Sequence, residues 1–541
     1  MVTTIFSFLP IVLLIYLMTK KNSVPSSKAL PLTALITYLI MLVIFRQDAN
    51  LVHANVAKGL LVAWTPILII AGAIFLFRTM EATGSLSVIR QWLNTVSENK
   101  IAQLMIVGWA FPFLIEGASG FGTPAAIAAP ILVGLGFPPV RVAILALIMN
   151  SVPVSFGAVG TPTWFGFSAI ELTAQETLTI GFKSAIMNGT AALIIPALAL
   201  MFVVKPKSVL KNWLFILLSV LATVIPYILV AKVNYEFPSL VGGTIGLIFT
   251  AILAKTGIGL SKSTVELQEQ VGSSSLLHEE KKTAKKEKLS AAKLVKATFP
   301  LWGTLLLLII TRIPQLGIKS LLTSTSNALS VNLGSIGEFS LSPALVVSLK
   351  DIFGAGINWS HQILYVPSVL PFVLISVVTF LLYSTSTKQA KSVLQETTQQ
   401  MVNPTKALLG ALVFVNLMMM GDASAVDNIG QSLAELTGSS WKYFASFLGA
   451  IGSFFSGSNT ISNLTFGGIQ DSIAMSLSLD RTTILAMQSV GGAMGNMVCI
   501  NNIVAVASVL ALGNIEGYIL KRTVRAMLVY GAIVGLLAFF L

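Results

Sequence analysis

The sequence predicts an all-α polytopic membrane protein with about twelve transmembrane helices plus two re-entrant hairpins. Three observations lead to this fold class. The 541 residues are 55% hydrophobic and 10% charged, with a mean hydropathy of +0.85, whereas soluble domains have about 25% charged residues. Apolar segments of the length that crosses a bilayer recur along the chain, without the strict alternation of an outer-membrane barrel. Several of these segments are interrupted by glycines and hydroxyl side chains.

The first apolar segment is interpreted as a retained helix with its N-terminus outside the cell. Its residues precede Lys20 and Lys21, whereas a secretory signal has its positive charge first. The apolar segments follow in the order 4–18, 29–45, 56–77, 101–139, 142–168, 180–204, 212–231, 238–254, 294–311, 364–386, 408–420, 443–479, 482–513 and 523–541.

The distribution of lysine and arginine gives the topology. If 101–139 and 443–479 are hairpins that enter and leave on one side, the other twelve segments cross the membrane and both termini lie outside. Most of the 34 lysines and arginines then face the cytoplasm, as the positive-inside rule requires. This topology also explains the net charge of +13, so the lipid bilayer is the expected partner and nucleic acid is not.

Two polar segments lie between the apolar ones. The loop 255–293 contains the basic run 281–288 and is interpreted as a solvated linker. The outside segment 312–363 is longer than a simple loop and is long enough for a surface helix.

An internal repeat divides the chain. A shift of 340 residues aligns Gly117 with Gly457 and Arg141 with Arg481, and the topology gives the two halves opposite orientations. Inverted repeats with interrupted helices are typical of secondary transporters, whose substrate site lies near the bilayer midplane. The expected organisation is a first inverted repeat 1–204 (hairpin 101–139, broken helix 142–168), connecting helices and loop 205–293, and a second repeat 294–541 (hairpin 443–479, broken helix 482–513).

Four polar breaks indicate one central site. They lie at 116–126 and 456–463 in the hairpins, and at 157–164 and 491–502 in the following segments. In hydrocarbon, non-helical backbone survives only where it is buried or lines a watery cavity, and a helix N-terminus there suits a carboxylate. The alternative is that the glycines only allow close helix packing. The candidate substrate-binding residues are Gly117, Ser119, Gly120, Thr123, Gly160, Thr161, Ser458, Asn459, Thr460, Asn496 and Asn501.

Two carboxylates are candidates for proton coupling. Glu116 stands beside the first hairpin tip at membrane depth, where a charge is costly and usually functional. Asp422 lies where a helix emerges, and a helix-capping role is equally compatible with that position. Arg141 and Arg481 follow the hairpins, and we interpret them as interfacial anchors rather than substrate clamps. No nucleotide, acyl-transfer or zinc motif occurs and Cys499 is the single cysteine, so neither a metal, a cofactor nor an enzymatic activity is expected.

Two stretches resemble the bacterial lactate permease family, namely 112-PFLIEGASGFGTPAAIAAPIL-132 and 149-MNSVPVSFGAVGTPTWFG-166. The resemblance covers essentially the full length and includes 453–467 and 491–505. It implies uptake of L-lactate, D-lactate and glycolate with protons. It also implies an elevator-like transporter, in which two hairpin-bearing transport units move against a scaffold.

The leading hypothesis is therefore a proton symporter that imports lactate and glycolate across the bacterial cytoplasmic (inner) membrane. A sodium-coupled carboxylate carrier is the alternative within transport, because hydroxyls and carbonyls at a helix break also hold Na⁺. Outside that class, the alternatives are a small-anion channel and a membrane enzyme. A homo-oligomer is compatible with the sequence.

Overall fold

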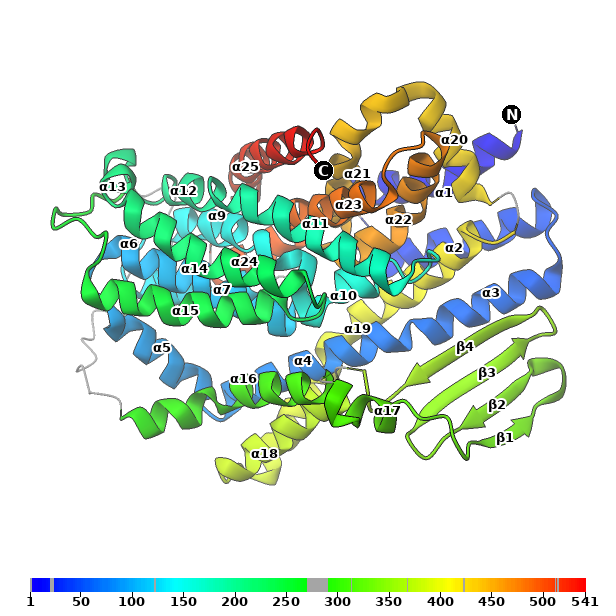
Figure 1. Cartoon of the computed structure of the whole chain (residues 1–541), viewed down its shortest axis with the longest axis horizontal. Coiled ribbons are helices and arrows are strands. Elements are labelled where there is room, and N and C mark those ends of the chain that lie inside the picture. Colours follow the sequence, from blue (N-terminus) through cyan, green and yellow to red (C-terminus); the bar gives the residue numbers. More distant parts are fainter. Residues whose placement is uncertain are drawn as a thin grey trace. The chain divides into compact units, whose positions relative to one another are not determined.

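The computed structural model describes residues 2–19, 24–120, 123–269, 290–312, 314–366, 368–421, 424–510, 512 and 515–541. The chain is mostly helical and divides into two compact units. Unit 1 comprises residues 1–88 and 291–436, and unit 2 comprises residues 89–290 and 437–541. Each unit is therefore built from two stretches that are far apart in the sequence (Figure 1).

Unit 1 combines helices with a small sheet. Its elements are α1 (Val2–Thr19), α2 (Ser26–Val43), α3 (Ala49–Val62), α4 (Trp64–Ala82), α16 (Ala291–Arg312), the 3-10 turn η4 (Pro314–Leu316), α17 (Ile318–Leu322), β1 (Leu329–Asn332), the 3-10 turn η5 (Gly334–Ile336), β2 (Glu338–Leu341), β3 (Val346–Ile352), β4 (Ile357–Gln362), the π-helix η6 (Val369–Leu374), α18 (Ile375–Leu382) and α19 (Thr387–Met418). The helices α5 (Ser85–Val96) and α20 (Ala425–Thr437) contain the boundaries between the units.

The long helix α19 forms the centre of unit 1. It begins at a capping box, in which the Ser386 side chain accepts from the Gln389 backbone N–H and the Gln389 side chain accepts from the Ser386 backbone N–H. Glycines let α19 approach its neighbours closely. A Cβ atom on Gly410 would lie 2.4 Å from the backbone nitrogen of Pro31 in α2, and one on Gly59 of α3 would lie 2.7 Å from Cα of Val413. Such contacts between small residues are the usual basis of helix packing in membranes.

The segment after α17 forms a four-stranded antiparallel sheet in the order β1-β2-β3-β4. Its register pairs Glu338 with Lys350 and Leu349 with Trp359. The expectation of an all-α chain is wrong for this segment, because it forms a sheet. The α-helix that precedes the strands, α17, has only five residues. The strands have only four to seven residues each, so their alternation is a weak signal beside the long apolar helices.

Unit 2 is built from helices in its described residues, apart from an isolated antiparallel bridge between Val204 and Leu267. Its elements are α6 (Lys100–Gln103), the π-helix η1 (Leu104–Ala110), α7 (Phe111–Ser119), α8 (Thr123–Gly134), α9 (Pro139–Met149), the 3-10 helix η2 (Val152–Phe156), α10 (Gly157–Trp164), α11 (Ala174–Ala192), α12 (Ile195–Leu200), α13 (Pro206–Lys211), α14 (Trp213–Ala231), α15 (Pro238–Thr256), the 3-10 turn η7 (Gly438–Ser440), α21 (Trp441–Ser456), α22 (Asn459–Ser476), α23 (Arg481–Asn496), α24 (Ile500–Val509) and α25 (Glu516–Leu537).

Glycines also set the helix spacing in unit 2. A Cβ atom on Gly243 of α15 would lie 2.4 Å from the Leu114 backbone nitrogen in α7, and one on Gly491 of α23 would lie 1.9 Å from the Ser446 carbonyl oxygen in α21. The polar groups between these helices are mostly paired. The Trp109 Nε1–H of η1, for example, donates to the Thr223 hydroxyl of α14 over 3.1 Å. The backbones of these neighbouring helices are in close contact. This contact holds the helices that form the two hairpins in fixed positions.

Eight helices among the described residues are long and apolar enough to cross a membrane, or nine if α9 and residues 152–164, which are bent by 41°, form one broken span. The number twelve, the two inverted repeats and the position of the termini stay predictions. The basic run 281–288 lies outside the described residues.

The chain turns close to the predicted breaks. Gly120 (φ +64°) ends α7 and Gly457 (φ +70°) ends α21. The predicted break at 491–502 contains the interruption at 497–499, although its first residues, 491–496, continue the helix α23. A string of small residues suits close helix packing as well as it suits a break.

Candidate functional site

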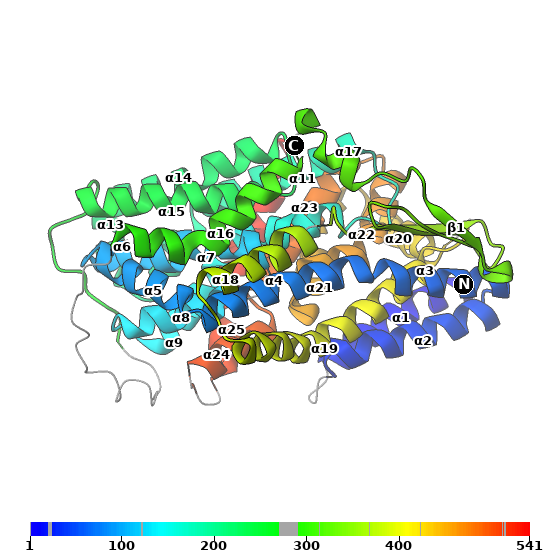
Figure 2. The same ribbon diagram turned by 90° about the horizontal axis from the view of Figure 1, so that it is seen from below.

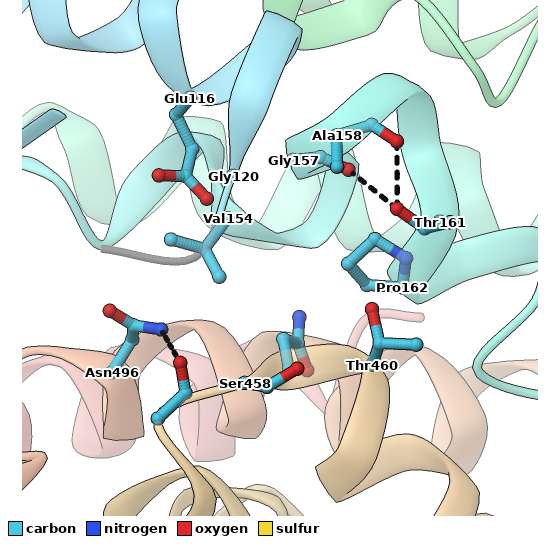
Figure 3. A pocket seen from close by; sticks show the side chains of 12 residues that line it. Glu116, Gly120, Val154, Gly157, Ala158, Thr161, Pro162, Ser458, Thr460 and Asn496 are labelled. Carbon is cyan, nitrogen blue, oxygen red and sulfur yellow. Dashed lines mark hydrogen bonds between the residues drawn. The ribbon is translucent and has the colours of Figure 1, made fainter. Parts of the chain in front are cut away.

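The two hairpins of unit 2 end at one pocket (Figure 3). The cavity is narrow in this structure: about 10 Å³ of it can hold the centre of a water-sized sphere, which is room for about one water molecule. Figure 3 shows Glu116 and Val154 on one side of this space, and Ser458, Thr460 and Asn496 on the other. The lining residues are Glu116, Gly120, Val154, Gly157, Ala158, Thr161, Pro162, Gly457, Ser458, Asn459, Thr460 and Asn496.

Glu116 is held in place by its neighbours. Its side chain is buried, and Asn150 Nδ2 donates a 3.1 Å hydrogen bond to its Oε2. The other carboxylate oxygen lies against Gly157, where a Cβ atom would come within 2.5 Å of Glu116 Oε1. The glycine therefore makes room for the carboxylate, and the amide orients it toward the pocket.

The backbone opposite the first tip is left-handed over three successive residues. Ala158, Val159 and Gly160 have φ values of +44°, +58° and +70°. Each non-glycine residue in this region costs of order 1–3 kcal/mol, and such strain tends to be found at functional sites. The Thr161 hydroxyl supports the turn by donating to the carbonyls of Ala158 (2.7 Å) and Gly157 (3.2 Å). Gly157 and Ala158, at the start of this turn, line the pocket.

The second tip places the N-terminus of α22 at the pocket. The Ser458 side chain caps this helix by accepting from the Ile461 backbone N–H over 3.3 Å. Asn459 Nδ2 donates to the Ser489 carbonyl over 2.9 Å, while its Oδ1 is buried without a partner among the described residues. A helix N-terminus carries a partial positive charge. The described lining contains neither lysine nor arginine, so positive potential there comes from helix N-termini such as this one.

A buried hydrogen-bond network supports the pocket from behind. Asn188 Nδ2 donates to the Ser155 hydroxyl (3.0 Å) and to the Tyr227 hydroxyl (3.1 Å), and Asn188 Oδ1 accepts from the Tyr530 hydroxyl (2.6 Å). The Ser155 hydroxyl donates in turn to the Ser489 carbonyl over 3.3 Å. That carbonyl also accepts from Asn459, so one backbone oxygen joins the network to the second hairpin tip.

Seven of the residues predicted from the sequence line the pocket, namely Glu116, Gly120, Thr161, Ser458, Asn459, Thr460 and Asn496. Their roles stay predictions.

Three other candidates do not line it. Gly117 faces α15, where a Cβ atom would lie 2.5 Å from the Leu240 backbone nitrogen, and Gly160 faces the Tyr235 carbonyl oxygen at 2.1 Å. Close packing accounts for both glycines. Asn501 is exposed. The side chains of Ser119 and Thr123, and all of Asp422, lie outside the described residues.

Sequence reasoning missed two supporting asparagines. Asn150 bonds to Glu116, and Asn502 Nδ2 donates to Asn496 Oδ1 over 2.7 Å. Asn502 is the buried member of the pair 501–502. A helix break separates this pair from α23, and the helical phase that decides which asparagine points inward cannot be carried across a break.

Both arginines that follow the hairpins bind protein groups. Arg481 pairs with Asp471 of α22 through two nitrogens, Nε and Nη2 (2.9 Å for Nη2), and with Glu176 over 3.1 Å. Arg141 Nη1 donates to the Phe202 carbonyl over 2.9 Å. Neither lines the pocket. In the described part of the chain, no group of three or more His, Cys, Asp or Glu side chains is placed to hold a metal ion.

The comparison with known proteins decides the family. The profile described as L-lactate permease matches residues 3–541. The chain belongs to the L-lactate permease family. A relative in Haemophilus influenzae that is assigned to the same permeases is 51% identical over 100% of this chain and 99% of its own length.

Two relatives that are named for different substrates are also similar to this chain. The Bacillus subtilis L-lactate permease is 27% identical, over 93% of this chain and 90% of its own. The Escherichia coli glycolate permease is 24% identical, over 94% of this chain and 90% of its own length. Together with the apolar helices, this membership makes the chain an integral membrane transporter.

Proposed function

We propose that this chain imports lactate and glycolate across the bacterial cytoplasmic membrane together with protons. The family supports the substrate class, because its relatives are named as permeases of L-lactate and of glycolate. Both molecules are small 2-hydroxy monocarboxylates that differ by one methyl group. A pocket that binds the carboxylate and the neighbouring hydroxyl would accept both.

One observation carries the proposal: a buried carboxylate, Glu116, shares a pocket with the N-terminus of α22. Helix N-terminal amides and the hydroxyls of Ser458 and Thr460 suit the substrate carboxylate. The unpartnered Asn459 Oδ1 suits its hydroxyl.

Electrostatics couples the proton to the substrate. An ionised Glu116 and a bound anion would repel strongly in a pocket of low dielectric constant. Protonation of Glu116 would therefore favour binding of the anion, and binding of the anion would favour protonation. A proton and an anion that bind together and leave together constitute symport, and the loaded site carries no net charge from this pair.

Sodium coupling is the alternative, favoured by another feature of the same region. The oxygens Asn459 Oδ1, Ser453 Oγ and Ser489 Oγ are buried without hydrogen-bond partners among the described residues. Uncharged oxygens are ligands that hard cations accept. Glu116 favours the proton because it is the one ionisable side chain in the described lining.

Transport by movement of unit 2 fits the division of the chain. Both predicted hairpins and both predicted broken helices, within 101–168 and 443–513, fall in unit 2, whereas 29–45 and 364–386 fall in unit 1. The described pocket lining belongs to unit 2 alone. We propose that unit 2 carries the substrate as one body and that unit 1 is the scaffold.

Accessibility from the two sides tests this movement. A single cysteine replaces Thr460 on a Cys499→Ser background, in sealed vesicles of each orientation. Membrane-impermeant thiol reagents should reach it from both sides, with rates that change when lactate is added. Labelling from one side alone, in all conditions, would rule out alternating exposure of the pocket.

Uptake into proteoliposomes tests the coupling. We expect radiolabelled lactate to accumulate under an inward pH gradient and to ignore a sodium gradient. Glu116→Gln should keep downhill exchange of lactate but lose accumulation driven by the pH gradient. The exposed Glu435 provides a control, since Glu435→Gln should behave as the wild type. Normal pH-driven accumulation by Glu116→Gln would remove Glu116 from the mechanism, and accumulation that required sodium would favour the alternative.

A further inference from the structure

A second, apolar groove lies within unit 1, far in sequence from the pocket residues. Three helix faces form it. The residues on α2 and on α19 both follow the spacing i, i+3, i+4, i+7 of a single helix face, and those on α3 follow i, i+3, i+7. The groove contains about 1040 Å³ of empty space, part of it open, and is lined by Pro31, Ala34, Leu35, Tyr38, His53, Val56, Leu60, Lys406, Leu409, Gly410 and Val413.

The helices α2 and α19 run in the same direction along the groove. Gly410 packs against Pro31, and Gly421 after α19 lies beside Gln47 after α2, where a Cβ atom would be 3.2 Å from Gln47 Nε2. Figure 2 shows the two helices side by side. Lys406 comes one turn before Gly410, so it lies at the Pro31 end of the groove.

Positive charge gathers at this end. Lys28 stands almost one turn before Pro31 on the same face of α2, and both Lys28 and Lys406 are exposed. Neither forms an ion pair with any acidic side chain that the structure describes. By the topology expected from the sequence, this is the cytoplasmic end, where basic sites between helices bind anionic headgroups.

A polar pair closes the other end. The Tyr38 hydroxyl and His53 Nε2 are 3.0 Å apart and the two rings stack. Pro31 and Tyr38 are seven residues apart on α2, about 10 Å along a helix. Between its two polar ends the groove is almost wholly apolar, which suits part of an acyl chain.

We propose that the groove of α2, α3 and α19 binds an anionic phospholipid. One acyl chain lies along the groove, and the phosphate contacts Lys406 and Lys28. Because the groove belongs to unit 1, which we assign to the scaffold, the lipid stays with the scaffold during transport. The binding itself depends on neither the substrate nor the proton.

The test measures lipid binding to the full-length protein in detergent. Native mass spectrometry compares phosphatidylglycerol with phosphatidylcholine of the same acyl chains. We expect tighter binding of phosphatidylglycerol, and Lys406→Gln should weaken it about fivefold, the factor for one lysine near an anionic headgroup. Lys406→Arg should keep the preference. Lys391→Gln is the matched control, because Lys391 is exposed on α19 and does not line the groove.

A second variant tests the acyl-chain part of the site. Val56→Phe fills the groove without changing its charge and should reduce occupancy by both lipids. If Lys406→Gln keeps the full preference for phosphatidylglycerol, the proposal is wrong. It is also overturned if Val56→Phe leaves lipid binding intact and instead changes the oligomeric mass, because the groove would then be an interface between two copies. Neither result depends on lactate transport, so this proposal and the proposed function can fail separately.

Discussion

Two adjacent glycines in α23 allow a sharp test of the pocket. A Cβ atom on Gly492 would lie 1.8 Å from Asn459 Oδ1, and the other nearby atoms also belong to side chains. A Cβ atom on Gly491 would meet the backbone of Ser446 at 1.9 Å. In Gly492→Ala the end of the Asn459 side chain can move away, whereas in Gly491→Ala the helices α21 and α23 must separate.

The size of the effect follows from the bond that would be lost. To reach ordinary contact with the new methyl group, Asn459 must swing aside and release its 2.9 Å bond to the Ser489 carbonyl. The displaced Asn459 Oδ1 also leaves the position from which we propose that it contacts the substrate hydroxyl. Losing that buried hydrogen bond to the substrate costs about 1–3 kcal/mol, which corresponds to roughly a five- to hundredfold weaker affinity. We expect Gly492→Ala to fold with only the modest stability loss of the released Ser489 bond, and to bind lactate that much more weakly, as Asn459→Ala should. Gly491→Ala should instead lower the thermal unfolding midpoint.

The assay is isothermal titration of lactate into purified protein, with thermal unfolding measured in parallel. Gly517→Ala is the control, because a Cβ atom there would meet nothing within 4 Å. If Gly492→Ala binds lactate as tightly as the wild type, Asn459 does not contact the substrate. If both variants unfold alike, the distinction between the side-chain contact and the backbone contact is wrong.

Two further predictions concern other hydrogen bonds within unit 2. Tyr530→Phe should cost about 1–3 kcal/mol in the free energy of unfolding, because it leaves buried Asn188 Oδ1 without its donor; equal stability of the variant in chemical unfolding would contradict this. Burial raises the pKa of Asp480, but the hydrogen bonds from Lys183, Thr482 and Thr483 outweigh it, so the pKa falls from 3.8 to about 2. A carboxyl group whose pKa is lowered by folding stabilises the fold at pH values above its unfolded-state pKa. This stabilisation is lost as the pH falls. The difference in melting temperature between wild type and Asp480→Asn should therefore shrink as the pH falls from about 4 to about 2, and a difference that stays constant over that range would refute it.

The sequence was most informative where polar residues interrupt apolar segments. Glu116 and the Ser458–Thr460 tip could be found because a charge or a helix break at membrane depth needs a reason. Gly117 was chosen by the same argument, yet its neighbour across the interface is Leu240 of α15. Sequence periodicity cannot distinguish a glycine that faces a ligand from one that faces another helix.

Residues that act across long sequence distances were beyond this reasoning. Asn188 and Tyr530 lie in ordinary apolar helices and gain their role only because folding places them together. The sheet at 329–362 was missed for a different reason, since its strands are too short to show a reliable alternation.

The shared Ser489 carbonyl also has a consequence for biogenesis. It joins Ser155, from the first stretch of unit 2, to Asn459, from the second, and the chain between those stretches is the second stretch of unit 1. The ribosome therefore completes the first stretch, including Glu116, long before its partners emerge. Contacts between residues so distant in sequence form late and slowly, and an unfinished pocket exposes polar groups inside the bilayer. The nascent chain should thus be most vulnerable to membrane proteases while residues 291–436 are being synthesised, and truncation before α21 should leave a product that is degraded rather than one that transports slowly.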